Sequence, residues 1–399
     1  MARTPGLGSL LDVDRRDFLR LIGLCAAQAT LGWAAVGARP TPATDPPTAV
    51  PYAPRLREVL RRPIVLAKGD VLEGKSFTLA PDFAWTQSMA AIYASGPGIV
   101  IRNVDVIGAS EWQPRWDAYR EPVGGPAGIP SGCAGIRMQR VPGAQVTGVT
   151  VTGFPGPGFT AFGLDDAFVR DVRVSHCFAG VVVEWYQRNH RVLVEDVHAE
   201  DLWGPGPGRW PRIGGAPSRR RPGKWMGGDG LVLESLRAST VRNCTAVGEQ
   251  FGSFKLVNPQ DVQVSGLQGV NLMVQGTSDL DWKIDTVPAK NVRVSGSTLD
   301  KSLGTGEIVD AGNALQISWN VENILIENCV LRAAGHDGHG IQFAKYVHGR
   351  VVGCTIEGFN GRRGQSPAYA IEVTDGSTVN DDFAKVNTFV DQHRIILRD

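Results

Sequence analysis

The sequence lacks an excess of charge of either sign, and this removes one general means of attracting a partner. Its 399 residues contain 41 lysines and arginines against 40 aspartates and glutamates, a formal net charge of +1. A chain with this balance produces no overall field that attracts nucleic acid or an anionic membrane surface. We therefore expect no nucleic-acid partner, and any electrostatic recognition must be local.

Disulfide and zinc signatures are missing too. No C-x-x-C motif or Cys/His spacing of the kind that binds zinc occurs in the sequence. The cysteines beyond the first 40 residues are odd in number and cannot form a complete set of disulfides, so we expect most to be buried apolar residues: Cys133, Cys177, Cys244, Cys329 and Cys354. The sequence predicts no cofactor. A calcium ion (Ca²⁺) stays an alternative, because its site needs oxygen ligands that converge in space.

The N-terminal region lacks a hydrophobic run long enough to cross a membrane. Its apolar run, residues 21–31, is shorter than the roughly 20 residues that span a bilayer, and it follows Arg15-Arg16-Asp17-Phe18-Leu19. Paired arginines before an apolar run resemble the twin-arginine export signal of bacteria. We predict a signal peptide at residues 1–38 and a Pro-rich leader at 39–64. The resemblance implies export by the twin-arginine translocase, a periplasmic or secreted location, and no membrane attachment after processing.

An internal repeat is present along most of the remaining chain. Its unit is a small residue followed by alternating apolar residues, as in Gly135-Ile136-Arg137-Met138, and then a second alternating segment such as 146–151. The unit recurs in about ten copies of roughly 22–33 residues, within the range of solenoid repeats. Alternation with a period of two predicts strands, and the copies are too short to contain a crossover helix of ordinary length.

Stacked coils of strands satisfy this pattern, so we predict an all-β fold, a right-handed parallel β-helix over residues 65–399. The pattern resembles the pectin-lyase-like superfamily, a resemblance that implies the fold and no particular activity. Asn103, Asn243 and Asn328 occupy equivalent places, where an Asn can form a tight turn and pair with its copy in the next coil. One residue per coil should point inward in a single apolar ladder: Ile136, Val181, Leu231, Phe254, Trp282, Leu315, Ile341 and Ile371.

Long inserts precede the first strand of several coils, and the two largest lie at 110–133 and 202–229. Insertions in a solenoid map to one edge, often the binding edge. Aromatic faces suit sugar rings and guanidinium groups suit carboxylates, so we predict substrate-binding residues in these inserts: Trp112, Trp116, Trp203, Arg209, Trp210, Arg212 and Trp225. The alternative is a loop that packs its own aromatic residues beside a solvated basic run.

Alternation also predicts which charged side chains point outward from the first strand of each coil. They are Arg137, Glu184, Glu234, Lys255, Lys283 and Asp285. We expect Lys283 to follow Lys255 in the stack, and a second cation at that distance lowers the pKa of a lysine and favours a general base. Glu234 and Asp285 would offset the repulsion, and Arg137 would bind a substrate carboxylate. The alternative is an exposed ladder of mixed charge without a catalytic role.

One further candidate is His339, in the triplet Gly338-His339-Gly340 before a predicted strand. This triplet resembles one element of the polygalacturonase-type glycoside hydrolase pattern and makes His339 a catalytic candidate. The adjacent acids Asp165-Asp166 lie far upstream of the coil where that family has its own pair. A glycine-rich turn before a strand explains the triplet equally well.

Three functions remain open from the sequence. The first is cleavage of an acidic, uronate-containing polysaccharide by β-elimination, with Lys255 or Lys283 as base. The second is a glycoside hydrolase of the same fold that uses a carboxylate pair such as Glu184 and Glu234. The third is a non-catalytic carbohydrate-binding or envelope structural protein. All three have a polysaccharide as partner.

Overall fold

The fold was analysed in a computed structural model. The structure describes residues 56–398, with gaps at 85, 87–88, 109–132, 155, 185–188, 203–228, 250–251, 277–288, 306–311, 337, 361–367 and 393. The described coils belong to one compact unit, Tyr52–Asp399. No helix in the described part of the chain has the length and apolar character needed to span a membrane.

The first of two parallel sheets, here called sheet B, receives one strand from each coil. In the described residues its strands follow chain order without exception, so each coil lies directly on the one before. The strands are β2 (Ile64–Leu66), β4 (Ala90–Ser95), β6 (Ala134–Gln139), β8 (Pro157–Phe162), β10 (Ala179–Val183), β13 (Leu231–Glu234), β17 (Phe254–Val257), β20 (Leu272–Gln275), β24 (Leu315–Ser318), β27 (Ile341–Ala344), β30 (Ile371–Val373) and β33 (Ile396–Arg398).

The second sheet, sheet A, receives the longer segments of the same coils. Its strands are β1 (Arg57–Leu60), β3 (Val71–Leu79), β5 (Val100–Ile107), β7 (Gln145–Thr152), β9 (Phe168–Ser175), β11 (Asn189–His190), β12 (Leu193–Glu200), β14 (Leu236–Arg237), β15 (Thr240–Arg242), β16 (Thr245–Glu249), β18 (Gln260–Ser265), β19 (Gln268–Gly269), β21 (Ala289–Ser295), β22 (Thr298–Asp300), β23 (Gly304–Thr305), β25 (Val321–Glu327), β26 (Val330–Arg332), β28 (Val347–Val352), β29 (Thr355–Glu357), β31 (Thr378–Val379) and β32 (Thr388–Val390). Two short helices, η5 (Lys301–Leu303) and α3 (Phe383–Val386), complete the described elements.

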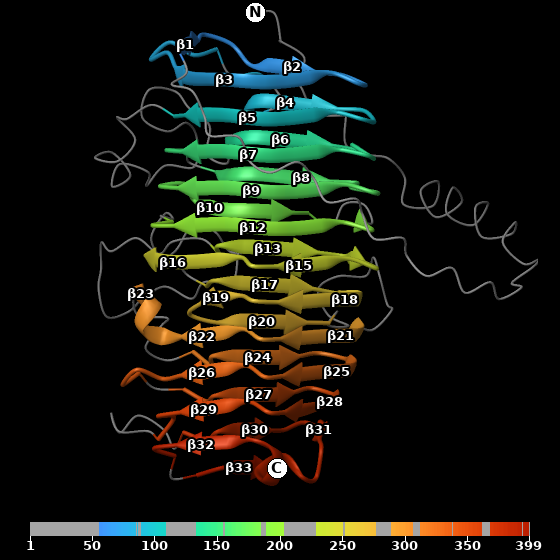
Figure 1. The fold of residues 1–399 in the computed structure, drawn as a ribbon, viewed down its shortest axis with the longest axis vertical. Helices are drawn as coiled ribbons and strands as arrows, with labels where there is room; N and C mark the ends of the chain where they lie inside the picture. The colour runs from blue at the N-terminus through green and yellow to red at the C-terminus, as the bar shows by residue number, and fades with distance from the viewer. Residues whose placement is uncertain are drawn as a thin grey trace, which may run out of the picture. The chain divides into compact units, whose positions relative to one another are not determined.

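The two sheets form one continuous solenoid, which confirms the predicted right-handed parallel β-helix. Figure 1 shows the coils stacked along the long axis, with the strands of the two sheets running in opposite directions on opposite sides of each coil. Connections between parallel strands of one sheet are right-handed in nearly all known proteins. A single apolar core runs between the sheets and contains buried residues from almost every coil. The first coil begins earlier than the predicted boundary at residue 65, because β1 already pairs in parallel with β3.

The predicted inward ladder is confirmed in all but one coil. Ile136, Val181, Leu231, Phe254, Leu315, Ile341 and Ile371 are all buried in sheet B. The exception is Trp282, which lies outside the described residues. The strand that follows β17 is β20, with Leu272 opposite Phe254. This coil is shorter than the others, so the expected spacing led to Trp282 in place of Leu272. Sheet B has 12 described strands where about ten coils were predicted, because β2 and β33 add one strand at each end.

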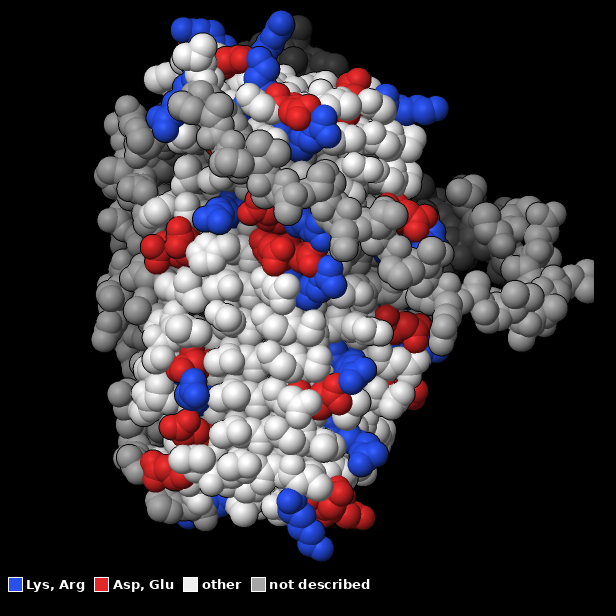
Figure 2. All heavy atoms as spheres, in the orientation of Figure 1, with Lys and Arg blue, Asp and Glu red and all other residues white. Residues whose placement is uncertain are grey.

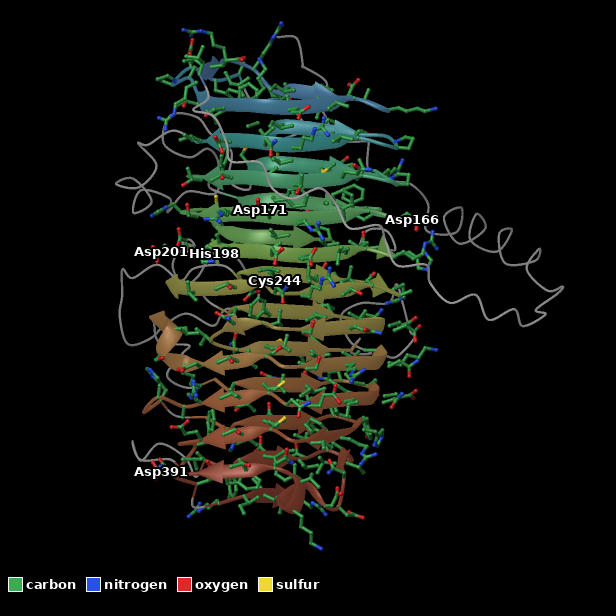
Figure 3. The ribbon with its side chains drawn as sticks, viewed as in Figure 1. Asp166, Asp171, His198, Asp201, Cys244 and Asp391 are labelled. Atoms are coloured by element: carbon green, nitrogen blue, oxygen red, sulfur yellow. The ribbon has the colours of Figure 1, made fainter. Side chains whose placement is uncertain are left out.

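Left-handed backbone corners bend successive coils of sheet A at the same place. Register aligns Asn103, Asp171 and Asn243 in one column, and each has a positive φ between 49° and 57°. Asn, Asp and Gly tolerate this conformation best. Figure 3 shows Asp171 of this column in the middle of the molecule and Asp166, from a second such column, at its edge. The members of the first column are Gly74, Asn103, Gly148, Asp171, Asp196, Asn243, Gly266, Gly296, Asn328 and Gly353.

The predicted pairing of asparagines at this corner is wrong, and the reason is steric. Asn243 and Asn328 each have a glycine as the next residue in the column, and a Cβ at Gly266 would lie 2.7 Å from Oδ1 of Asn243. Asn243 and Asn328 therefore each lie beside a glycine of the next coil rather than beside another Asn. An amide ladder forms at the second corner instead, where Asn323 Nδ2 donates to Asn291 at 2.7 Å and Asn291 donates to Asp261 at 2.7 Å.

The cysteines have a structural place beside the first corner. Cys244 and Cys329 follow corner residues, and each Sγ donates to the carbonyl two residues earlier at 3.3 Å. Ser297 makes the same contact with its hydroxyl at 3.1 Å. Burial raises the pKa of the Cys177 and Cys244 thiols to about 12, so these groups stay protonated donors. The described cysteines are all free and buried, as the sequence predicted.

Charged residues on the outside of sheet A are paired rather than grouped by sign. Figure 2 shows Lys and Arg next to Asp and Glu on the face it draws. Glu195 is 5% exposed and accepts a hydrogen bond from Arg170 at 2.5 Å and an ion pair from Arg242 in the next coil. Burial opposes ionisation here, but the hydrogen bonds from Arg242 and Arg170 outweigh it and lower the pKa of Glu195. These ion pairs between described residues stabilise the contact between neighbouring coils.

Replacing Leu231 by Asp tests the strand phase. Leu231 is completely buried, so the carboxylate would lose water without gaining a partner, and we expect the free energy of unfolding to fall by several kcal/mol. The matched control is Val232→Asp on the outward face of the same strand, which should cost about 1 kcal/mol or less. Urea unfolding measures both. Equal stability of the two variants would show that the strand faces are assigned incorrectly.

Candidate functional site

The outward face of sheet B holds the described site residues predicted from the sequence. Residues from successive strands form columns on this face, with neighbours separated by about 4.8 Å. One column contains Arg137 on β6 and Lys255 on β17, and a parallel column contains Glu184 after β10 and Glu234 at the end of β13. The sequence therefore placed four candidates on one surface from alternation alone.

Arg137 and Glu184 belong to a hydrogen-bonded group at the carboxyl ends of these strands. The Thr160 hydroxyl donates to Oε1 of Glu184 at 2.7 Å, and the Arg137 guanidinium lies 3.9 Å from the same oxygen. Both charged side chains remain about one-fifth exposed. Buried Asn189 joins the two glutamate-bearing coils, since its Nδ2 donates to the backbone carbonyls of Glu184 and Glu234 at 3.1 and 3.0 Å. This group can bind a polar ligand while its backbone is fixed.

The structure contradicts the predicted neighbour of Lys255. Its partners in sheet B are Val232 on β13 and Met273 on β20. Lys283 and Asp285 lie outside the described residues. They follow β20 in the sequence, and β20 occupies the place in the ladder that was predicted for their strand. The like-charge pair that would have made Lys255 a general base is therefore absent from the described ladder. The short coil at β20 is the physical reason.

A carboxylate at the opposite edge of the face interacts electrostatically with Lys255. Asp229 immediately precedes the turn into β13 and is only 9% exposed. Burial raises the pKa of Asp229 to about 6, and the positive charge of Lys255 acts against that shift. A Cβ at Gly252 would lie 2.7 Å from Asp229 Oδ1 and 3.3 Å from Asn271 Oδ1, so the absent side chain of this glycine makes room for both groups.

Hydrogen bonds to the side chains of Asn271 and Ser253 fix the backbone next to Gly252. Its Oδ1 accepts the backbone N–H of Ser253 at 2.8 Å, and the Ser253 hydroxyl accepts the backbone N–H of Val270 at 2.6 Å. Asp229 is thus held against Gly252 and Asn271, a position here called the recess, where the charge of Lys255 acts on it. A carboxyl with a pKa near neutrality exchanges protons readily, so the recess suits general acid or base chemistry.

His339 belongs to a second polar group on the same face, three strand spacings from Lys255. The strands run from β17 through β20 and β24 to β27, which puts His339 about 14 Å further along the axis. Its neighbours are Asn313, Gln342 and Glu372. The structure therefore separates the predicted catalytic histidine from the predicted catalytic lysine.

The predicted aromatic and basic residues of the inserts cannot be placed. Trp112, Trp116, Trp203, Arg209, Trp210, Arg212 and Trp225 lie outside the described residues. The described ends of those inserts lead into β6 and β13, the strands that carry Arg137 and Glu234. Their substrate-binding role stays a prediction.

Sequence reasoning missed Asp229, Asn271, Thr160 and Glu372 as site residues. Asp229 lies in the segment Gly228-Asp229-Gly230, which along the chain has the pattern of a tight turn, and its burial depends on Gly252 in the next coil. Thr160 and Glu372 occupy the outward positions of β8 and β30, so alternation could have found them. The sequence signal for both is that they are polar residues at outward positions of the column that contains Arg137 and Lys255.

One cavity of about 150 Å³ lies at the edge of the solenoid, near the turn that precedes β27. Its walls include His336, Glu357, Asn360 and Asp391, and Figure 3 marks Asp391 near the C-terminal end. Within the described ranges no group of three His, Cys, Asp or Glu side chains is arranged to hold a metal ion. The cavity is separate from the recess at Asp229.

Comparison with known proteins gives no family assignment. Neither a protein-family model nor a curated protein matches the chain. Among solved structures, the catalytic domain of a GH87 α-1,3-glucanase in complex with tetrasaccharides is 13% identical with a TM-score of 0.41 over 85% of this chain and 63% of that domain. A periplasmic alginate epimerase is 10% identical with a TM-score of 0.43 over 86% and 78% of the two chains.

An endo-xylogalacturonan hydrolase from Aspergillus tubingensis is also 10% identical, with a TM-score of 0.36 over 87% of this chain and 84% of that one. The chain spans less than two thirds of the glucanase domain. At these identities and TM-scores the likeness assigns no activity to this chain. The chemistry of the sheet B face is the remaining basis for a function.

Replacing Asp229 by Asn should stabilise the protein at neutral pH. The pKa of Asp229 rises from 3.8 to about 6 on folding, so the folded state binds the proton more tightly and stability falls as pH increases from about 4 to 6. Above that range the ionised group costs roughly 1–3 kcal/mol, and Asn removes the cost. Urea unfolding at pH 4 and 7.5 measures the difference.

Exposed Glu322 supplies the control, because Glu322→Gln should change stability little at either pH. Destabilisation of Asp229→Asn at pH 7.5 would mean that Asp229 is a paired structural carboxylate. In that case Asp229 would no longer be a candidate for a catalytic residue.

Proposed function

We propose that this protein is an exported carbohydrate-active enzyme that cleaves an acidic, uronate-containing polysaccharide by β-elimination. The observation that carries the proposal is the buried carboxyl of Asp229, packed beside Gly252 at the edge of sheet B, with a pKa of about 6 that the charge of Lys255 acts to lower. A buried carboxyl that is difficult to ionise lowers the stability of the protein at neutral pH, and an enzyme benefits from such a group when it transfers a proton. A purely structural carboxylate at this place would normally be paired with a cation.

β-Elimination needs two things from the chain, a cation for the uronate carboxylate and a base for the adjacent carbon. Lys255 and Arg137 are cations in the outward column of sheet B and would bind substrate carboxylates. Asp229 would remove the proton from the carbon next to the carboxylate. The electron pair forms a carbon–carbon double bond, the bond to the glycosidic oxygen breaks, and that oxygen leaves with a proton from the medium or the enzyme.

Hydrolysis is the second candidate, and the same raised pKa favours it. A protonated Asp229 would donate its proton to the glycosidic oxygen as a general acid, while a second carboxylate acts on the sugar or on water. Glu184 and Glu234 are the described carboxylates on this face. They lie at the other end of the strands, so the hydrolase needs a wider arrangement than the lyase. A non-catalytic binding role is the third candidate.

A panel of acidic and neutral polysaccharides should separate the candidates. We expect ultraviolet absorbance from unsaturated sugar together with new reducing ends on an acidic polymer; reducing ends alone indicate hydrolysis. The pH dependence gives an independent check, because a base must be ionised and an acid protonated. For elimination kcat/KM should rise as pH passes about 6, and for hydrolysis it should fall. Absence of both products on every polymer would favour the non-catalytic role.

Two variants test the roles within the site. Lys255→Ala should leave the free energy of unfolding within about 0.5 kcal/mol of wild type and reduce kcat/KM on an acidic polymer about 100-fold. Gln316→Ala, two strands further along the same column, should have a much smaller effect. Loss of stability without loss of activity in Lys255→Ala would make the lysine a structural residue. Full activity in Asp229→Asn would exclude the proposed base.

Export rests on the paired arginines Arg15 and Arg16, and we propose the twin-arginine translocase as the route. Replacing both by lysine keeps the charge but removes the pair that the translocase reads. Fractionation of bacterial cells should then show the precursor retained in the cytoplasm, while wild type reaches the periplasm or medium. Unchanged export of the double variant would contradict this route.

A further inference from the structure

A chain of hydrogen-bonded polar side chains occupies the sheet B face beyond the Asp229 recess. Asn313 Nδ2 donates to Gln342 Oε1 at 3.0 Å, and Gln342 Nε2 donates to Glu372 Oε2 at 2.5 Å. The backbone N–H of His339 donates to Asn313 Oδ1 at 2.9 Å, which extends the network to His339. These residues come from three consecutive coils, so their relative positions are fixed by strand register. The network is a preformed polar surface.

The histidine of this network is held in one tautomer. Its Nδ1 accepts the backbone N–H of Tyr369 at 3.1 Å, so the ring proton is on Nε2. Burial lowers the pKa of His339; the charge of Glu372 acts against this and that of Lys301 adds to it. At pH 7 the ring is therefore neutral, with a single N–H donor that points toward Glu372.

That donor and the carboxylate do not satisfy one another. His339 Nε2 and Glu372 Oε1 are 3.6 Å apart, beyond hydrogen-bonding distance, and both side chains are 17% exposed. A group placed beside this pair, within hydrogen-bonding distance of both atoms, can accept from one and donate to the other. A hydroxyl does both, and a carboxylate cannot donate.

Charge along the face changes between the two ends. The outward column runs from Lys255 through Met273, Gln316 and Gln342 to Glu372. A uronate carboxylate is attracted at Lys255 and repelled at Glu372. Of the nearby cations, Lys301 acts on His339 from within the fold, since it is 1% exposed, and the Arg394 guanidinium lies over the Tyr369 ring at 5.7 Å.

We propose that His339 and Glu372 form a second sugar subsite, in which a hydroxyl of a neutral sugar bridges His339 Nε2 and Glu372 Oε1. The subsite lies four strand spacings, about 19 Å, from Lys255. The inference deepens the proposed function, on which it rests: a glycan bound along the face carries a uronate at Lys255 and a neutral sugar at Glu372. The substrate class is thus a heteropolysaccharide rather than a polymer of uronate alone. His339 is a substrate-positioning residue in this account.

Calorimetry on the full chain with Asp229→Asn, which does not cleave, tests the subsite. The probes are hexasaccharides of glucose, mannose, galactose and xylose, and of galacturonate and mannuronate as acidic counterparts. We expect at least one neutral hexasaccharide to bind. Adding Glu372→Gln should weaken that binding about tenfold and leave binding of the acidic hexasaccharides unchanged or stronger. His339→Gln is the second variant and should weaken the same neutral probe.

Glu322→Gln, an exposed change elsewhere on the solenoid, is the matched control and should not alter binding. Failure of all four neutral probes to bind, or equal binding with and without Glu372→Gln and His339→Gln in folded protein, would overturn the subsite. Weaker binding of the acidic probes in Glu372→Gln would overturn the neutral assignment. The cleavage assay on wild type is separate, so a chain that binds neutral probes but cleaves nothing contradicts only the proposed function.

Discussion

In-register stacking of parallel strands is the constraint on which the rest of this structure depends. Each position of a coil lies about 4.8 Å from the same position in the next, so a residue that suits one coil must tolerate its copy on either side. The left-handed corners show the consequence, because Asn243 is followed in its column by Gly266, over which its side chain lies. The same constraint makes the outward columns of sheet B an ordered array of side chains that the backbone fixes before any ligand arrives.

On such a scaffold, candidate functional residues are those whose neighbours in the column do not resemble them. Asp229 is a carboxylate in an edge position where the next coil offers only Gly252, and burial raises its pKa to about 6. Elsewhere buried acids are neutralised, as Glu195 is by Arg170 and Arg242. The contrast between these two carboxylates separates a stabilising ion pair from a group held in an unfavourable state. That difference supports a catalytic role for Asp229 and a structural one for Glu195.

The fold could be predicted from the sequence because its signal repeats in nearly every coil. Alternation fixed the inward residues, such as Leu231 and Ile341, and the outward ones, such as Arg137 and Lys255. The prediction from alternation failed at the short coil of β20. There the expected spacing put Trp282 in the place of Leu272 and Lys283, in place of Met273, next to Lys255. The recess at Asp229 could not be predicted, since its burial arises from contacts between coils, which a period along the chain does not contain.

The central claim is that the outward face of sheet B binds an acidic glycan through Lys255 next to Asp229. A crystal structure of the Asp229→Asn protein with an acidic oligosaccharide, long enough to cross several coils, tests it most directly. The account predicts the sugar chain over β13 and β17, with a uronate carboxylate on the Lys255 ammonium. An oligosaccharide bound on sheet A, or in the cavity beside Asp391, with the sheet B face empty, would contradict it.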